Sequence, residues 1–125
     1  MRSIIAVVLA GLLTACVASP GSRHPGRDQL TGAQIRATEA LNLYDAIQRL
    51  RPQWLGSRGP MSASDPTPTF AHVAVNGTMA GDIDVLRNLN SQEIELVRFL
   101  APGAAAALYG MGHPRGVIDA TMRRR

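Results

Sequence analysis

The chain has no lysine and only one cysteine, Cys16, among its 125 residues. A single cysteine excludes a disulfide bond within one chain. Aromatic residues make up 4% of the sequence and apolar residues 46%, so the core must be built mainly from aliphatic side chains. The thirteen basic residues are all arginine, give a formal net charge of +4, and are scattered except at the last three positions. Because no basic face is interleaved with aromatic residues, we expect no nucleic-acid partner.

Residues 1–15 have the composition of a secretory signal peptide. Arg2 gives a positive start, and the apolar run that follows is shorter than the roughly 20 residues that a transmembrane helix needs. The run ends in Leu13-Thr14-Ala15-Cys16, which resembles the lipobox of bacterial lipoproteins. This resemblance implies cleavage before Cys16 and acylation of its thiol and new amino terminus. The alternative is a buried free thiol behind an ordinary signal peptide.

The lipobox resemblance also implies a location. In such lipoproteins an aspartate after the cysteine favours retention in the inner membrane, and here that position is Val17. We therefore expect the chain to be held on the outer membrane through Cys16, with its folded part facing the periplasm. Residues 16–30 are rich in Pro, Gly and Ser and lack an apolar period, which predicts a flexible tether before a domain over residues 31–125.

Two short helices are predicted at the start of this domain. Thr31 and Gln34 fit a capping box, which predicts a helix over 32–37. Asn42 is a predicted N-cap, and Pro52 ends the second helix. Four apolar residues of this second helix share one face at helical spacing: Leu43, Ala46, Ile47 and Leu50. Trp54 is expected to begin an extended segment that packs on a sheet.

The remainder of the domain alternates between strands and short helices. Residues 56–69 contain three prolines and read as a loop. A strand over 70–75 ends at Asn76-Gly77, a strong turn signal. The segments predicted after it are a short helix or turn over 82–89, a turn at 91–93, a strand over 95–100, a helix over 103–108 and a strand over 117–122.

Several short segments in this region form an ordered series. They are Phe70-x-x-Val73-x-Val75-Asn76-Gly77, Leu86-x-x-Leu89, Glu93-Ile94-Glu95-Leu96-Val97, Ala104 to Ala107 with Leu108-Tyr109-Gly110, and Gly116-Val117-Ile118. This series resembles the plug domain of TonB-dependent outer-membrane receptors. The resemblance implies an α+β fold with a small mixed β-sheet flanked by short helices. Because the sequence ends at Arg125, we expect this plug-like domain without the β-barrel of those receptors.

The resemblance also assigns structural roles to single residues. Gly77 and Gly110 would permit turns that a Cβ disfavours, and Tyr109 would cover the end of the sheet. Val117 and Ile118 would complete the sheet, and Val75, Asn76 and Gly116 are further structural residues of the motif. Asn76 stands where the family usually has Asp, and Arg115 replaces the first of two closing glycines.

No arrangement of residues in the sequence predicts catalysis. His24, His72 and His113 lie far apart without a second ligand at metal spacing, so no metal or other cofactor is expected. No nucleophile elbow is present. We therefore expect a non-enzymatic protein that binds another envelope protein through a free sheet edge. The alternatives are a small-ligand carrier, in which the loop Gly56 to Thr69 closes over an unknown ligand, and a receptor remnant without a role.

Overall fold

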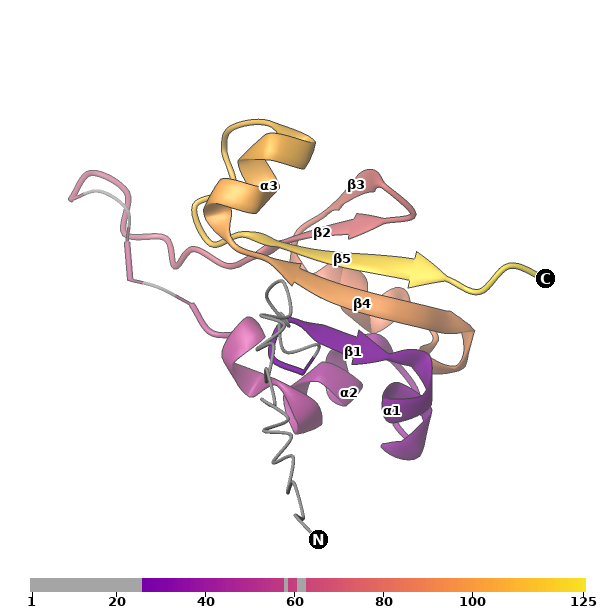
Figure 1. The fold of residues 1–125 in the computed structure, drawn as a ribbon. Coiled ribbons are helices and arrows are strands. Elements are labelled where there is room, and N and C mark those ends of the chain that lie inside the picture. The colour runs from indigo at the N-terminus through magenta and orange to yellow at the C-terminus, as the bar shows by residue number, and fades with distance from the viewer. Residues whose placement is uncertain (1–25, 58, 61–62) are drawn as a thin grey trace, which may run out of the picture.

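The computed structural model describes residues 26–57, 59–60 and 63–125, which form one five-stranded open sheet with short helices (Figure 1). The strands are β1 (Gln29–Thr31), β2 (His72–Val75), β3 (Thr78–Gly81), β4 (Ile94–Leu100) and β5 (Val117–Met122). Their order in the sheet is β1-β4-β5-β2-β3. The β2 and β5 strands are parallel and the other neighbours are antiparallel. The predicted α+β class, with a small mixed sheet and short helices, is confirmed.

One face of the sheet carries the main core. The helices α1 (Gly32–Ala37) and α2 (Leu43–Leu50) cover it together with the 3₁₀ segments η1 (Pro52–Trp54), η2 (Ile83–Asn88) and η3 (Ser91–Glu93). The fully buried side chains of this core include Ile35, Leu43, Ile47, Leu86, Val73, Val97 and Ile118. On the second face one helix, α3 (Pro102–Tyr109), lies over one end of the sheet and packs Ala105 on Ala74 and Val117 (Figure 1).

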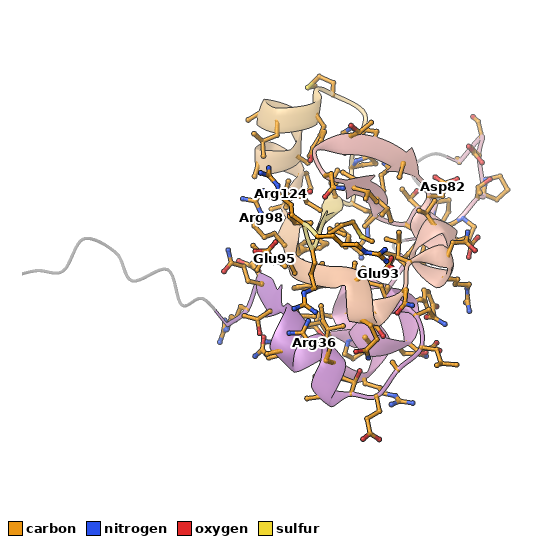
Figure 2. All side chains as sticks on the ribbon, turned by 90° about the vertical axis from the view of Figure 1, so that its right-hand side faces the viewer. Arg36, Asp82, Glu93, Glu95, Arg98 and Arg124 are labelled. Atoms are coloured by element: carbon orange, nitrogen blue, oxygen red, sulfur yellow. The ribbon has the colours of Figure 1, made fainter. Side chains whose placement is uncertain are left out.

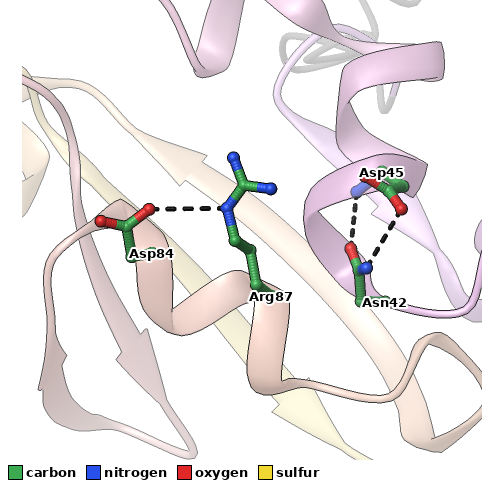
Figure 3. A network of polar contacts seen from close by, with 4 residues as sticks. All are labelled: Asn42, Asp45, Asp84 and Arg87. Atoms are coloured by element: carbon green, nitrogen blue, oxygen red, sulfur yellow. Dashed lines mark hydrogen bonds and ion pairs between the residues drawn. The ribbon is translucent and has the colours of Figure 1, made fainter.

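Both predicted helix starts are confirmed at their caps. Thr31 Oγ1 accepts a hydrogen bond from the Gln34 backbone, and the Thr31 backbone donates to Gln34 Oε1 over 2.9 Å. At α2, Asn42 Oδ1 accepts from the Asp45 N–H over 2.9 Å, and Asn42 Nδ2 donates to Asp45 Oδ2 over 3.0 Å (Figure 3). These bonds satisfy backbone donors that a helix start would otherwise leave unpaired.

The segment η2 lies beside α2. Figure 3 shows its internal ion pair, in which Arg87 Nε is 3.5 Å from Asp84 Oδ1. The same guanidinium stands 3.9 Å from the ring centroid of Tyr44 on α2. Ion pairs and cation–π contacts this exposed contribute little to stability, so the burial of Leu86 of η2 in the main core contributes more.

Three features differ from the predicted order of elements. The strand β3 was not expected, and β1 starts two residues before residue 31, because buried Leu30 pairs with Val97 of β4. Trp54 was expected in an extended segment, and this prediction is wrong. Pro52 starts a 3₁₀ turn in which the Trp54 N–H bonds the Arg51 carbonyl. The expected packing on the sheet is found, since Trp54 stacks on Phe99 of β4 with ring centroids 5.6 Å apart.

Candidate functional site

The turn between β2 and β3 fixes one edge of the sheet. Asn76 and Gly77 have φ angles of 51° and 81°, the left-handed conformation that a two-residue hairpin turn needs. The Asn76 N–H donates to the Ala120 carbonyl, and Asn76 Oδ1 accepts from the Met122 N–H, both over 2.9 Å. The predicted turn is confirmed, and the two hydrogen bonds of Asn76 connect it to β5.

Strand β3 is an exposed edge. All four of its residues are exposed, and among the described residues it pairs only with β2. Thr78 lies opposite Val75 and closes the two-residue turn, so its backbone groups point inward to β2. The backbone groups of antiparallel strands alternate in direction, so the N–H and C=O of Met79 point away from the sheet. This edge therefore offers an unpaired donor and acceptor to another strand.

A hollow of about 650 Å³ lies on the second face, between this turn, the end of α3, the middle of β4 and the end of β5. Its lining includes Gly77, Leu108, Arg124 and the ion pair between Arg98 and Asp119. In the ion pair, Arg98 Nη2 of β4 lies 2.7 Å from Asp119 Oδ2 of β5. Figure 2 shows Arg98 and Arg124 near each other above Glu95. The Asp119 carboxylate is 6% exposed and needs this partner, whereas the Arg98 side chain is 41% exposed and reaches solvent.

The sequence prediction did not include this ion pair. Arg98 and Asp119 are directly opposite in the β4–β5 register, and they lie 21 residues apart in the chain. The alternation of side chains along each predicted strand would place both on the second face. That alternation could have indicated that the two side chains share a face. It does not show which residue of β4 lies opposite which residue of β5, so the pair could not be predicted.

Tyr109, at the end of α3, has a phenol whose pKa lies above its ordinary value. Partial burial is the main cause, and the Asp119 carboxylate raises the pKa further by its charge and as a hydrogen-bond acceptor. The Arg98 guanidinium opposes these effects. Because the folded-state pKa exceeds that of the unfolded chain, the neutral phenol adds stability below about pH 10, and this is lost as the pH rises through the folded pKa.

Replacing Asp119 by Asn is expected to lower the pKa of Tyr109 toward its ordinary value. The substitution removes the negative charge that disfavours tyrosinate and leaves the Arg98 cation that favours it. The pKa is measured from tyrosinate absorbance in a Tyr44→Phe background, where Tyr109 is the remaining tyrosine. A pKa that is unchanged or raised in Asp119→Asn would contradict this coupling.

A second hollow of about 640 Å³ lies beside the loop 56–69, where that loop meets η2. Its lining includes Asp65, His72, Asp82, Asp84 and Arg87, so carboxylates outnumber the guanidinium. Thr67 donates two hydrogen bonds to Asp65, from its hydroxyl over 2.6 Å and its N–H over 3.0 Å. These bonds lower the pKa of Asp65, which therefore stays ionised at neutral pH.

The other predicted motif residues meet at the junction of β2 and β5. Gly110, with a φ of 84°, ends α3 after Tyr109, as predicted. Val117 and Ile118 begin β5 opposite His72 and Val73 of β2. Gly116, just before them, has a φ of 83° and accepts a hydrogen bond from the His72 N–H. Val75 ends β2 opposite Ala120.

Cys16 lies outside the described residues, as do the predicted signal peptide and most of the predicted tether. Among the helices of residues 26–57, 59–60 and 63–125, none is long and apolar enough to cross a membrane. Arg115 donates through Nη2 to the Gly56 carbonyl over 2.8 Å. No family model, curated protein or solved structure matches the chain.

Proposed function

We propose that this chain is a lipid-anchored protein of the bacterial outer membrane. Its plug-like domain faces the periplasm and binds an extended segment of another envelope protein, without catalysing a reaction. The support for the anchor is the lipobox-like sequence that ends at Cys16, and the support for the plug-like domain is the ordered series of motifs from Phe70 to Ile118. Two or three acyl chains would hold such a protein on the membrane, whereas one would hold it weakly.

The observation that carries the binding proposal is the exposed edge of β3. A partner segment in extended conformation would add to the sheet beside β3 and pair with the N–H and C=O of Met79. The adjacent turn residue Gly77 also lines the hollow of the second face. A segment that continues past this turn reaches Arg98 and Arg124, which favour an acidic side chain there.

The edge is tested with Met79→Pro and its matched control Met79→Ala. Proline removes the outward N–H of Met79 without removing a β2–β3 hydrogen bond, whereas alanine removes the side chain and keeps the N–H. We expect an envelope protein to be recovered by cross-linking with the parent and with Met79→Ala, and at least tenfold less with Met79→Pro. A tenfold loss corresponds to about 1.4 kcal/mol, within reach of one or two hydrogen bonds and a steric block.

Two results would contradict this binding mode. One is equal recovery of the partner by Met79→Pro and the parent, and the other is a parent that recovers no envelope protein above background. The melting temperatures of the three proteins are compared first, since β3 is an edge strand and tolerates proline where the N–H faces solvent.

The anchor is tested separately with Cys16→Ser. The parent should incorporate an alkyne-tagged fatty acid and sediment with outer membranes, whereas Cys16→Ser should do neither. A parent that is unlabelled and stays in the supernatant would contradict the anchor, whatever the result at β3.

The hollow beside the loop 56–69 favours a second candidate function, a carrier of a small ligand. Residues at the end of the loop, among them Asp65, Thr67 and Thr69, line this hollow, so loop movement would change its volume. A carrier is stabilised by its ligand, by about 2.7 kcal/mol at a ligand concentration 100 times the Kd. A thermal-shift screen of chelates and glycans in which no compound raises the melting temperature would count against it.

A further inference from the structure

The fold brings two histidines into direct contact. His72 on β2 and His113 in the loop before β5 are 41 residues apart in sequence, and their Nδ1 atoms are 2.9 Å apart. The rings meet edge to face, with centroids 4.9 Å apart and planes at 81°. The sequence spacing gave no sign of this pair, because it forms only when β2 and the loop before β5 meet.

The backbone fixes both histidines through Gly116. The His72 N–H donates to the Gly116 carbonyl over 3.2 Å, and the Gly116 N–H donates to the His113 carbonyl over 3.0 Å. Pro114 follows His113 and restricts the loop further. Two hydrogen bonds through one residue therefore fix the backbone of both histidines, so a ligand site here needs only side-chain rotation on binding.

Asp82 lies behind the His72 ring. Its Oδ1 is 3.7 Å from His72 Nε2, beyond hydrogen-bond distance, and its negative charge favours a cation near this ring. A carboxylate hydrogen-bonded to the second nitrogen of an imidazole is the usual support of a metal-binding histidine, and Asp82 stands near that position. His72 also lines the hollow in which Asp65, Asp82 and Asp84 outnumber Arg87, so the local charge favours a cation.

The two Nδ1 atoms are close enough to share one ion. Two imidazole nitrogens about 2.05 Å from one ion are about 2.9 Å apart when they subtend a right angle, and about 3.3 Å apart at the tetrahedral angle. The observed 2.9 Å is a hydrogen-bond distance, and rotation of the two rings would turn both nitrogens toward an ion in adjacent square-planar or tetragonal positions without a large change in this distance. Among divalent ions of the first transition series, Cu²⁺ prefers this geometry and binds nitrogen ligands most tightly.

We propose that His72 and His113 bind one Cu²⁺ ion through their Nδ1 atoms, in adjacent positions of a tetragonal site. On binding, the ring that donates the Nδ1 hydrogen bond releases that proton to water and takes one from water on Nε2, so that both rings are neutral and both Nδ1 lone pairs are free for the ion. Within the described parts of the chain no three His, Cys, Asp or Glu side chains can share one ion, so water or an external ligand fills the other positions. The site does not depend on the proposed strand addition. Figure 2 shows Asp82 far across the view from Arg98 and Arg124.

The test uses the full chain carrying Cys16→Ser, so that no thiol binds or reduces the ion, and CuCl₂ as the probe. We expect one Cu²⁺ per chain, with an electron paramagnetic resonance spectrum of a tetragonal ion that shows hyperfine coupling to two imidazole nitrogens. In competition with a chromophoric chelator, His72→Gln and His113→Gln should each raise the Kd for Cu²⁺ at least tenfold. His24→Gln is the matched control and should leave the Kd within twofold of the parent.

The proposal is overturned if the electron paramagnetic resonance spectrum of the parent with Cu²⁺ lacks hyperfine coupling to two imidazole nitrogens. This result does not depend on whether any variant folds. It is also overturned if either His72→Gln or His113→Gln leaves the Kd within twofold, or if Zn²⁺ binds more tightly than Cu²⁺. Met79→Pro should bind Cu²⁺ like the parent, so a failed metal site and a failed sheet edge give different results.

Discussion

Replacing Gly116 by alanine is expected to lower the free energy of unfolding by about 3 kcal/mol or more. A Cβ at this position would lie 2.1 Å from the Leu100 carbonyl oxygen, and the φ of 83° is a conformation that side chains disfavour. The Leu100 backbone cannot move away without a cost in free energy, because it is paired with Val117 in the β4–β5 ladder. The substitution therefore combines backbone strain with a clash against a fixed strand. It should also separate His72 from His113, since both bond to the Gly116 backbone.

The change in free energy is measured by urea unfolding, with two glycine controls. Gly103→Ala, in α3, has no atom within 4 Å of the new Cβ and should cost nothing or add up to about 1 kcal/mol of stability. Gly112→Ala has open space but a φ of 102°, so it isolates the cost of backbone strain, about 1 to 2 kcal/mol. If Gly116→Ala unfolds within 1 kcal/mol of Gly112→Ala, the clash with Leu100 is not the cause.

Elements whose signals are local were predictable from the sequence. The capping box at Thr31 and the cap at Asn42 act within three residues, and the structure has both where they were expected. The apolar stripe of α2 likewise predicted the buried residues Leu43, Ala46 and Ile47, and its fourth member, Leu50, is partly buried, because helical spacing alone decides which residues share a face. Asn76-Gly77 is a local signal too, since its conformation depends on those two residues.

Elements defined by distant partners were not predictable in this way. Strand β3 has four exposed residues and so no alternation of apolar and polar positions, and β1 has a single buried residue, Leu30. Both become strands because β2 and β4 offer them backbone partners. The same holds for the candidate sites. The contact between His72 and His113 and the ion pair of Arg98 with Asp119 both depend on the register of β5 against its neighbours.

Replacing Leu43 by alanine is expected to be the other strongly destabilising change, at about 2 to 5 kcal/mol. Its side chain is 0% exposed in the main core, so truncation leaves a cavity that the surrounding helices and strands fill only in part. A domain of this size has a total stability of about 5 to 15 kcal/mol, and the loss should lower the melting temperature by at least roughly 10 °C.

Leu41→Ala is the matched control for Leu43→Ala. The two leucines are two residues apart and undergo the same chemical change, but Leu41 is 86% exposed, so its truncation should alter the free energy of unfolding by less than about 0.5 kcal/mol. Any general effect of losing a leucine before or at the start of α2 is thus separated from the effect of the cavity. Equal losses for the two substitutions, measured by calorimetry and urea unfolding, would mean that the apolar stripe of α2 does not face the core. The packing of α2 on the sheet, which also positions Tyr44 beside Arg87 and the acidic hollow, would then be wrong as described.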